Sequence, residues 1–365
     1  MQKKIAHIVT GNIWGGIEQM IYSWSLALKE RGYTVYIVIQ KGELEFAEIF
    51  SKVAIVKQID FEQQAYMQKV FQLRAFIKQE RIGIVNVHNN RMAYMLALVK
   101  AFVPGLKLVS FRHNVLKTKA DLFHDFLYAR VDRFICVSNA VHQAQLLNIR
   151  PYLQPRFIKV YNGININNLK IAPAKSINKS EPFKIGYAGR ITEGKGIHIL
   201  LEAAKSAQAN LSRPVQVIIA GKPHTENDNA YKAFLEQLIA QLGMQTQVVF
   251  LGFCEDMSKF YQQIDLLILP SVIKEGFGLV LCEAMFFRVP VITTDTGGQI
   301  EIIQHEENGL VVSADNVEEL SAAICKLLNN PTFAEQLITQ AKKDFHEKYT
   351  LEICMDKLEK IYREL

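Results

Sequence analysis

The stretch from Ser271 to Met285, SVIKEGFGLVLCEAM, indicates both the fold and the binding chemistry of this chain. It follows an apolar run at Leu266–Leu269 that predicts a buried strand. It then breaks at two glycines and ends in an apolar run that predicts a helix. In a strand–turn–helix unit the first N–H groups of the helix have no partner within the helix. Such groups bind anions, so the stretch predicts a phosphate or diphosphate site.

Two glutamates flank the glycine turn at different depths. Glu275 precedes the turn, and Glu283 lies in the second turn of the predicted helix. Carboxylates accept hydrogen bonds from hydroxyl groups, so both side chains can face one hydroxyl-rich ligand. A phosphate site beside two acids therefore indicates a phosphorylated, hydroxyl-rich molecule such as a nucleotide sugar.

The chain alternates short apolar runs with amphipathic helical stretches along its whole length. This alternation predicts parallel sheets covered by helices on both faces. A chain of 365 residues is too long for one ordinary sheet of this type. The predicted strands are Lys4–Val9, Thr34–Ile39, Val53–Val56, Gly83–Val87, Lys107–Phe111, Arg133–Val137, Phe157–Val160, Phe183–Ala188, Val215–Ala220, Gln247–Leu251, Leu266–Leu269, Pro290–Thr293 and Gly309–Val312.

We therefore predict an α/β fold with two doubly wound, Rossmann-like domains that face each other across a cleft. The first domain comprises residues 1–165, residues 166–182 form a linker, and the second domain comprises residues 183–349. The amphipathic helix at residues 350–365 has no following strand and is expected to cross back onto the first domain. Ligands of such folds bind at the carboxyl ends of the strands.

A second glycine loop, Gly186–Gly196, carries two cations. Arg190 and Lys195 lie five positions apart, between a predicted strand and a predicted helix. Arginine offers a fork of donors for two oxygens and lysine a compact charge, so together they suit one diphosphate. Surface charge without a ligand is the alternative for either residue alone.

The first strand is also followed by a glycine loop, Thr10–Glu18, which contains Gly15 and Gly16. It matches neither the dinucleotide-binding fingerprint nor a Walker loop, so neither of those sites is predicted. The glycine pair still permits close approach of the backbone to an anion. A tight turn without a ligand is the alternative interpretation.

Charge is distributed unevenly between the two halves. Residues 1–165 carry 22 Lys and Arg against 11 Asp and Glu, a net charge of +11, whereas residues 166–365 carry 20 against 25, a net charge of −5. The basic half predicts an anionic partner. The apolar segment Arg91–Val103, followed by Lys107, Arg112, Lys117 and Lys119, is a candidate contact with anionic lipid. A core helix with solvated lysines is the alternative, and no nucleic-acid motif is present.

Localisation is predicted from what the sequence lacks. No signal peptide is evident after Met1, and no window reaches the apolar length of a membrane span. The five cysteines form no Cys-x-x-Cys pair, which is typical of reduced thiols. We expect a cytoplasmic protein, peripheral on the inner face of the cytoplasmic membrane.

In its ordered motifs the chain resembles the retaining GT-B glycosyltransferases of family 4, also called glycosyl transferases group 1. The resemblance covers essentially the whole length. Its elements, in chain order, are Gly15–Glu18, Val137–Ala140, Tyr161–Gly163, Gly189-Arg190 with Lys195-Gly196, Glu275 with Glu283, Pro290–Ile292, Gly297-Gly298, Glu301–Ile303 and Asn308–Leu310. Each motif is weak alone, but the ordered set is specific.

The resemblance implies a role for each matched residue. Arg190 and Lys195 would neutralise the donor diphosphate, Glu275 would hold donor sugar hydroxyls, and Glu283 would bind the ribose. Further donor contacts would come from Gly15 and Gly16 in the first domain and from Phe277, Gly278, Leu279 and Val280 in the second. His113 would lie near the donor sugar as a catalytic residue, or else line the cleft as a polar side chain.

One segment departs from the family pattern. Where the family has small residues and a glycine before Val-Pro, this chain has Phe286-Phe287-Arg288. Arg288 is tolerable there if it points to solvent and interacts favourably with the carboxyl end of the helix dipole.

These observations predict a retaining, metal-independent glycosyltransferase that uses a nucleoside-diphosphate sugar, preferably a UDP-sugar, and no cofactor. No Asp-x-Asp pair occurs, which favours leaving-group stabilisation by fixed cations and helix-start amides. The expected acceptor is a glycan or lipid-linked molecule of bacterial surface polysaccharide or lipopolysaccharide synthesis. The alternatives are a nucleotide-sugar epimerase of the same fold and a non-catalytic sugar-binding protein.

Overall fold

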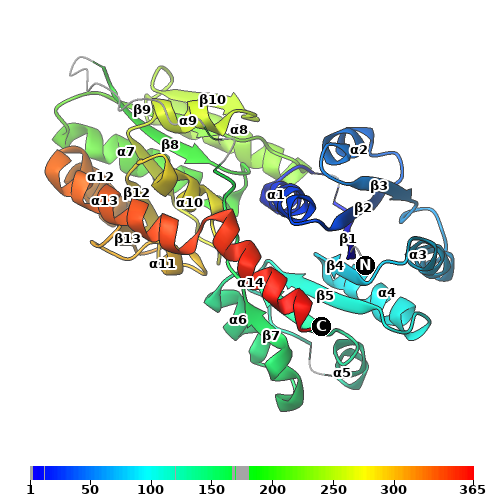
Figure 1. The fold of residues 1–365 in the computed structure, drawn as a ribbon. Helices are drawn as coiled ribbons and strands as arrows, with labels where there is room; N and C mark the ends of the chain where they lie inside the picture. The colour runs from blue at the N-terminus through cyan, green and yellow to red at the C-terminus, as the bar shows by residue number, and fades with distance from the viewer. Residues whose placement is uncertain (1–2, 12, 120, 167–168, 170–180) are drawn as a thin grey trace. The chain divides into compact units, whose positions relative to one another are not determined.

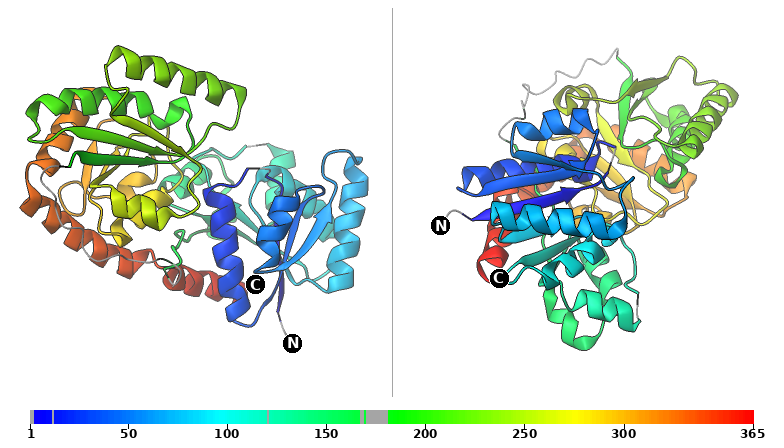
Figure 2. Two further views of the ribbon diagram at one scale, coloured as in Figure 1. Left: turned by 90° about the horizontal axis from the view of Figure 1, so that it is seen from above. Right: turned by 90° about the vertical axis from the view of Figure 1, so that its right-hand side faces the viewer.

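The computed structural model describes residues 3–11, 13–119, 121–166, 169 and 181–365, and it divides the chain into two compact units. Unit 1 comprises Met1–Asn165 with Thr350–Leu365, and unit 2 comprises Ile166–Tyr349. Each unit contains one parallel sheet with helices along its faces (Figures 1 and 2). Most of the predicted linker, at residues 167–168 and 170–180, lies outside the described residues.

Unit 1 is built on a seven-stranded parallel sheet in the order β3-β2-β1-β4-β5-β6-β7. Its strands are rich in isoleucine and valine and are mostly buried, as expected for a sheet covered on both faces. They are β1 (Lys4–Val9), β2 (Thr34–Gln40), β3 (Ile55–Ile59), β4 (Ile84–Val87), β5 (Lys107–Arg112), β6 (Arg133–Cys136) and β7 (Phe157–Lys159).

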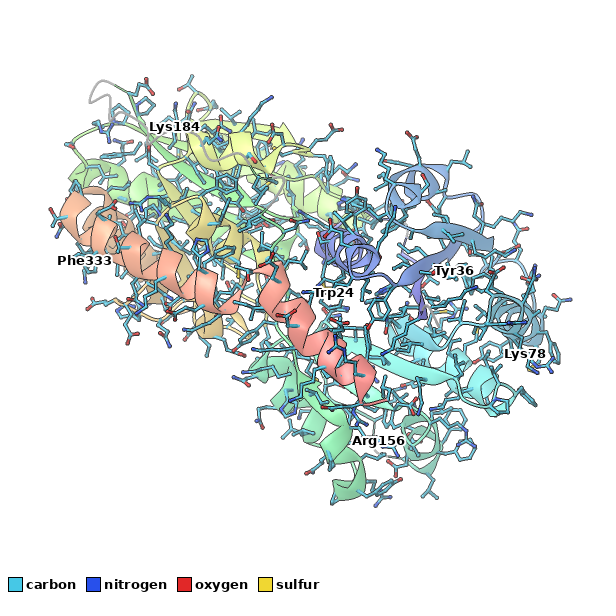
Figure 3. All side chains as sticks on the ribbon, in the orientation of Figure 1. Trp24, Tyr36, Lys78, Arg156, Lys184 and Phe333 are labelled. Carbon is cyan, nitrogen blue, oxygen red and sulfur yellow. The ribbon has the colours of Figure 1, made fainter. Side chains whose placement is uncertain are left out.

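The helices of unit 1 are α1 (Gly16–Glu30), α2 (Leu44–Ser51), α3 (Tyr66–Glu80), α4 (Asn90–Ala101), α5 (Leu122–Tyr128), α6 (Asn139–Leu146) and α14 (Leu351–Arg363), with a 3-10 helix at Pro151–Arg156. The amphipathic α14 packs beside α1, and its buried side chains join the core around Trp24 (Figure 3). Arg31 at the end of α1 forms an ion pair with Asp356 of α14, at 2.6 Å. The C-terminal helix is therefore an integral part of unit 1.

Helix α4 is a core helix, so of the two alternatives for Arg91–Val103 the structure supports the core helix and not the membrane contact. Six of its apolar side chains are buried: Met92, Ala93, Met95, Leu96, Ala97 and Val99. Arg112, predicted to flank that contact, is also buried and lies over the ring of Phe134 at 5.0 Å. The uninterrupted apolar run of α4 reflects burial against the sheet and neighbouring helices, and not contact with lipid.

Unit 2 is built on a six-stranded parallel sheet in the order β10-β9-β8-β11-β12-β13. Its strands are β8 (Phe183–Ala188), β9 (Val215–Ala220), β10 (Val248–Gly252), β11 (Leu266–Leu269), β12 (Val291–Thr294) and β13 (Leu310–Val312). Its helices are α7 (Ile197–Ala207), α8 (Glu226–Gln241), α9 (Met257–Gln263), α10 (Leu279–Phe286), α11 (Gln299–Ile302), α12 (Val317–Leu328) and α13 (Pro331–Lys348), with 3-10 helices at Glu193–Lys195 and Gln208–Asn210.

The two sheets share one topological property that locates their sites. Strand order reverses between β1 and β4 in unit 1, and between β8 and β11 in unit 2. At such a reversal the loops that follow the two strands leave in opposite directions and open a crevice at the carboxyl edge. The predicted α/β class with two Rossmann-like halves is confirmed. The candidate residues are expected in the loops that follow β1, β4, β8 and β11.

Candidate functional site

In unit 2 the two main sequence motifs meet at the reversal of strand order. The loop after β8 carries Arg190 and Lys195, and the loop after β11 carries Ser271 and Glu275. The strands β8 and β11 are hydrogen-bonded neighbours, so residues 80 positions apart in sequence lie side by side. The carboxyl edge of this sheet is thus where the candidate residues gather.

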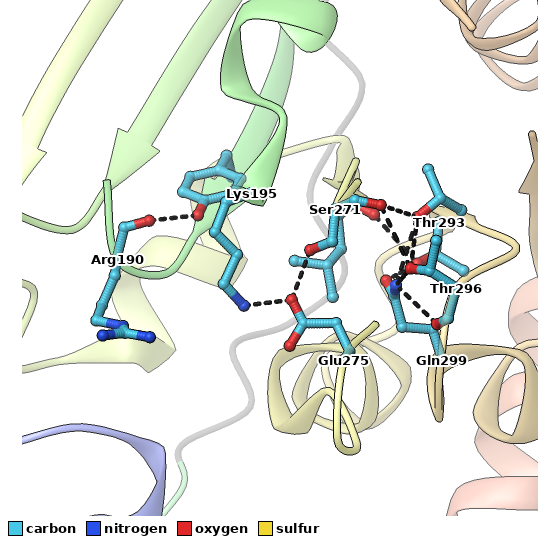
Figure 4. A network of polar contacts seen from close by, with 10 residues as sticks. Arg190, Lys195, Ser271, Glu275, Thr293, Thr296 and Gln299 are labelled. Carbon is cyan, nitrogen blue, oxygen red and sulfur yellow. Dashed lines mark hydrogen bonds and ion pairs between the residues drawn. The ribbon is translucent and has the colours of Figure 1, made fainter. Parts of the chain in front are cut away.

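Lys195 and Glu275 form an ion pair at the centre of this region (Figure 4). The Ser271 hydroxyl donates a second hydrogen bond to the same oxygen, Oε1 of Glu275, at 2.5 Å. Both charged side chains keep about 15% of their surface exposed, 16% for Lys195 and 14% for Glu275. The pair is therefore held in place while a ligand can still reach it.

The backbone of Glu275 is fixed by the glycines that follow β12. The N–H of Gly298 donates to the Glu275 carbonyl oxygen at 2.8 Å. Gly297 has a positive φ of 61°, and a Cβ at that position would lie 2.2 Å from the same oxygen. Only glycine combines this conformation with so close an approach, so the motif Gly297-Gly298 positions the acid.

A buried polar network, which sequence reasoning missed, supports Ser271 from behind (Figure 4). The Ser271 carbonyl oxygen accepts hydrogen bonds from the hydroxyls of Thr294, at 2.6 Å, and Thr296, at 3.3 Å. Gln299, which is fully buried, donates to the Thr296 hydroxyl at 2.7 Å and accepts from Thr293. These residues adjoin Gly297-Gly298 in sequence, so the glycine motif is the feature from which the network could have been predicted.

Arg190 differs from Lys195 in that its side chain is exposed and points away from the ion pair (Figure 4). Its backbone is nevertheless fixed, because the Tyr187 hydroxyl donates to the Arg190 carbonyl oxygen at 2.7 Å. The structure therefore brings Lys195, Ser271 and Glu275 together and leaves the Arg190 guanidinium at the edge of the group.

Helix α10 begins at Leu279 after Gly278, whose φ of 111° turns the chain into the helix. Phe277 is buried, whereas Leu279 and Val280 are half-buried at the first turn. The Leu281 N–H donates to the Gly278 carbonyl oxygen at 3.0 Å. The N–H groups of Leu279 and Val280 are the donors that the sequence predicted for an anion.

Glu283 is more deeply buried than the sequence suggested. It lies on α10 with 7% of its surface exposed, and it accepts a hydrogen bond from the Tyr261 hydroxyl at 2.7 Å. Burial raises the pKa of the Glu283 carboxyl from 4.5 to about 7, and the bond from Tyr261 opposes part of this shift. Glu275 and Glu283 therefore occupy different surroundings, one ion-paired and one desolvated.

The departure at Phe286–Arg288 is accommodated by a regular helix end. Arg288 adopts the left-handed conformation with φ of 60°, and the N–H of Val289 donates to the Ala284 carbonyl at 2.9 Å. This is the Schellman arrangement, in which glycine usually occupies the left-handed position. The Arg288 side chain is exposed and forms an ion pair with Glu335, so the expectation that it points to solvent is confirmed.

In unit 1 the predicted glycine loop follows β1, at the reversal of strand order. Gly15 has an extended backbone, and its N–H donates to the Glu18 carboxylate at 3.1 Å. A Cβ on Gly15 would meet only the Glu18 carboxylate, at an ordinary 3.5 Å. Neither conformation nor packing requires glycine at this position, and Gly16 is exposed at the start of α1.

His113 follows β5 and is the end of a chain of three imidazoles, which sequence reasoning did not find. Nε2 of His113 lies 3.1 Å from Nδ1 of His88, and Nε2 of His88 lies 3.0 Å from Nδ1 of His7. The amide of Asn86 continues the chain at 3.4 Å from Nε2 of His7. Only the alternation of β1 and β4, which places His7, Asn86 and His88 on one face, could have indicated it.

In the described part of the chain, no group of three or more His, Cys, Asp or Glu side chains is arranged to hold a metal ion. Among the helices that the structure describes, none combines the length and apolar character needed to span a bilayer.

Comparison with known proteins identifies the family. Residues 14–168 match the family described as Glycosyltransferase Family 4, and residues 170–344 match the family described as Glycosyl transferases group 1. The chain belongs to the family 4, group 1 glycosyltransferases. The predicted resemblance is confirmed, and the Gly15 loop and the Lys195–Glu275 pair fall within the two matched regions.

Relatives and solved structures agree with this assignment to the glycosyltransferases. An uncharacterized glycosyltransferase of Methanocaldococcus jannaschii is 34% identical over 215 residues, which are 56% of this chain and 53% of that protein. The capsular polysaccharide biosynthesis glycosyltransferase CapM of Staphylococcus aureus is 30% identical over 208 residues, 55% of this chain and 52% of that protein. The matching stretch thus spans about half the length of these curated relatives.

The fold of the glycosyltransferase is similar over its whole length to solved structures. The crystal structure of Anabaena HepE in complex with UDP matches with a TM-score of 0.86 and 20% identity, covering 100% of both chains. The predicted GT-B fold class is confirmed.

Proposed function

We propose that this glycosyltransferase moves a sugar from a nucleoside-diphosphate sugar to a glycan or lipid-linked acceptor, with retention at the anomeric carbon and without a metal ion. The observation that carries the proposal is the Lys195–Glu275 ion pair, held at the carboxyl edge of unit 2 by Gly297 and Ser271. The pair places a cation that can bind a diphosphate beside a carboxylate that can bind sugar hydroxyls.

Cleavage of the anomeric C–O bond leaves negative charge on the diphosphate. Lys195 is already fixed by Glu275, so it stabilises that charge with little reorganisation. The N–H groups at the start of α10 add donors of fixed direction, and Arg190 adds an exposed guanidinium from the loop after β8.

The surroundings of the two glutamates support retention. Oε1 of Glu275 accepts from Lys195 and Ser271, and Oε2 of Glu283 accepts from Tyr261. An ion-paired carboxylate such as Glu275 is a poor general base, and Glu283 is buried on α10 with its Oε2 bonded to Tyr261. We propose that the acceptor hydroxyl attacks from the face that the diphosphate leaves, and that a diphosphate oxygen takes its proton.

We favour a UDP-sugar as the donor and a surface polysaccharide as the product. HepE, whose fold is similar over the whole chain, is described in complex with UDP. CapM is described as an enzyme of capsular polysaccharide biosynthesis. Lipopolysaccharide synthesis is the second candidate for the pathway.

A donor screen tests the proposal. Purified protein is incubated with UDP- and GDP-sugars, with and without glycan or lipid-linked acceptors, and nucleotide release is measured with the metal chelator EDTA present. We expect release that depends on an acceptor and a product that keeps the anomeric configuration of the donor. Epimerised donor in the absence of acceptor would instead identify an epimerase, and binding without turnover would identify a sugar-binding protein.

We also propose that the protein associates with the cytoplasmic face of an anionic membrane, through a surface other than α4. Four apolar side chains of α5 and the preceding loop are at least half exposed: Leu116, Leu122, Phe123 and Phe126. We call them the α5 patch. Lys117 and Lys119 lie in the same loop, and the Arg130 guanidinium stacks on Phe126 at 3.4 Å. Apolar side chains edged by cations suit an interface with anionic headgroups.

Vesicle co-sedimentation tests the membrane proposal. We expect binding to vesicles that contain phosphatidylglycerol, weaker binding at high salt, and loss of binding when Leu122 and Phe123 are both replaced by Glu. Leu44→Glu, at an equally exposed position of α2, is the matched control. Sedimentation that is indifferent to anionic lipid and to salt would contradict the proposal.

A further inference from the structure

Three of the imidazoles of unit 1, those of His7, His88 and His113, form a chain on one face of the sheet. His7 and Asn86 are register partners of the parallel strands β1 and β4, and His88 lies two positions beyond Asn86. His113 lies two positions beyond Phe111, which stacks on His88 with ring centroids 4.9 Å apart. The alternation of the strands therefore aligns these side chains toward the α1 and α14 side of unit 1.

We propose that Asn86, His7 and His88 are positioning residues that fix His113 as a hydrogen-bond donor through its Nδ1 atom. This inference rests on the proposed function and on the family resemblance, which implies that His113 lies near the donor sugar. It goes further by naming the tautomer of His113 and the residues that set it.

The direction of the chain follows from the Asn86 amide. Its Nδ2 group lies 3.4 Å from Nε2 of His7, so that nitrogen is the acceptor and the proton of His7 is on Nδ1. His7 then donates to Nε2 of His88, and His88 donates from Nδ1 to Nε2 of His113. Because a neutral imidazole has one donor and one acceptor, the remaining proton of His113 is on Nδ1.

The order of protons along the chain requires neutral rings, and burial keeps the three imidazoles neutral. Burial lowers the pKa of His7 from 6.5 to about 3 and that of His113 to about 4, with Arg112 contributing to the second shift. The pKa of His88 is lowered well below 6.5 by burial and by the two neighbouring rings. At neutral pH each imidazole therefore carries one proton.

Stacking keeps the rings in register. The planes of His7 and His88 are inclined by 15° with centroids 5.3 Å apart, and those of His88 and His113 by 22° at 5.4 Å. Phe111 stacks on His88 and packs against Trp24 of α1 at 4.9 Å. The aromatic core thus limits rotation of the rings. The donor and acceptor order set at Asn86 therefore extends through His7 and His88 to His113.

The consequence concerns the chemistry of His113. Its Nε2 lone pair is occupied by His88, and its Nδ1 carries a proton, so neither nitrogen is free to act as a general base. His113 instead offers an N–H of fixed direction to a ligand oxygen. Preorganised donors of this kind contribute to binding and orientation without a change of charge.

Nitrogen-15 NMR of the protein with labelled histidine tests the proposal without any substrate. We expect His7, His88 and His113 each to show a pyrrole-type Nδ1 and a pyridine-type Nε2. A protonated Nε2 on His113, or a mixture of tautomers in the unmodified protein, would overturn the proposal. This result does not depend on transfer activity, so it remains informative if the donor screen identifies no substrate.

Two substitutions break the chain at different points. His88→Phe keeps the ring that stacks on Phe111 but removes both nitrogens, and Asn86→Leu removes the amide that sets the direction. In each variant we expect His113 to show mixed tautomers, and kcat/KM for the donor to fall about tenfold, as for other residues that orient a ligand-binding imidazole. If His88→Phe does not fold, Asn86→Leu still tests whether the chain sets the tautomer of His113.

His142→Phe is the matched control, because His142 is a half-buried histidine of the same unit that bonds only to the Phe157 carbonyl among the hydrogen bonds described. It should leave the His113 resonances and kcat/KM unchanged. A folded His88→Phe protein whose His113 remains a single Nδ1-protonated tautomer would overturn the proposal.

Discussion

The carboxyl edges of the two sheets hold their titratable groups in opposite ways. In unit 2 a lysine and a glutamate are charged, paired and partly exposed. In unit 1 three histidines bond to one another and have lowered pKa values, so they remain neutral. Both groups lie where strand order reverses, so topology fixes the place of a site but not its electrostatics.

The difference indicates that the two groups have different roles toward a ligand. An ion pair responds to an arriving anion because Lys195 can interact with a diphosphate as well as with Glu275, whereas a chain of neutral imidazoles offers direction without charge. Sugar transfer should therefore depend on the charges of the ion pair in unit 2. In unit 1 it should depend on the histidine tautomers.

Replacing either member of the ion pair should abolish most transfer. Lys195→Ala removes the cation that stabilises the leaving diphosphate, and Glu275→Ala removes the acid for sugar hydroxyls. We expect each to lower kcat by about 10²–10³-fold, the loss typical of a preorganised electrostatic group. Steady-state assays measure this effect, and circular dichroism checks the fold.

Lys326→Ala is the control, because Lys326 forms a surface ion pair with Glu306 in the same unit. It should leave kcat unchanged. Near-normal transfer by either Lys195→Ala or Glu275→Ala would remove the basis of the proposed site.

Gly297→Ala should damage both stability and transfer. A methyl group there would lie 2.2 Å from the Glu275 carbonyl oxygen, in a backbone with positive φ. We expect a loss of about 3 kcal/mol in the free energy of unfolding, from strain and overpacking together, and a large loss of kcat. Gly243→Ala is closely matched, with φ of 64° and no atom within 4 Å, so it should lose only about 1 kcal/mol. Equal losses in the free energy of unfolding of the two variants would show that contact with the Glu275 carbonyl oxygen does not contribute.

Glu283 should make stability depend on pH in the acidic to neutral range. Its pKa is raised from 4.5 to about 7, so the folded state binds more protons than the unfolded state between these values. The free energy of unfolding should therefore fall as pH rises from 4.5 to 7, by about 3 kcal/mol in total. Glu283→Gln should lack this slope, because its amide stays neutral and can still accept from Tyr261.

Denaturant titrations at pH 4.5, 6 and 8 measure the effect. Glu236→Gln, on the exposed face of α8, is the control and should retain the slope of the unmodified protein. A Glu283→Gln protein with that same slope would show that another group is responsible.

Arg288→Gly should have the smallest effect. Glycine relieves the left-handed strain at the end of α10 but loses the surface ion pair with Glu335. Relief of about 1 kcal/mol exceeds the few tenths that a surface pair contributes, so we expect slight stabilisation. Glu335→Gln removes the pair alone and serves as the comparison in thermal unfolding. A destabilised Arg288→Gly protein would show that the arginine contributes more than an exposed pair.

The fold was largely predictable from sequence because strands of covered parallel sheets are continuous apolar runs. All thirteen predicted strands correspond to strands of the structure. Their ends agree to within one residue except for the edge strand β3, which begins two residues and ends three residues later than predicted. For the same reason the sequence could not decide whether Arg91–Val103 is a membrane contact or a core helix. An apolar helix buried against a sheet and one lying on lipid have the same composition, and only the exposure of the apolar side chains distinguishes them; those of α4 are mostly buried.

The candidate site was only partly predictable. Loops that carry glycine and charge have a sequence signature, so Lys195 and Glu275 could be singled out. Their pairing could not, because it depends on which strands are neighbours. The histidine chain has even less signature, since His7 and Asn86 lie within apolar strands and acquire meaning only from the register of β1 with β4.

The position of α14 has a consequence for how the chain is made. Unit 2 is contiguous in sequence, whereas the core of unit 1 includes Leu351, Met355 and Leu358 from the helix that is synthesised after unit 2. During translation unit 2 can finish folding while the face of unit 1 around Trp24 still lacks its cover. The domain that begins first is thus completed last, and a chain cut short before α14 would leave an apolar face open to chaperones and proteases.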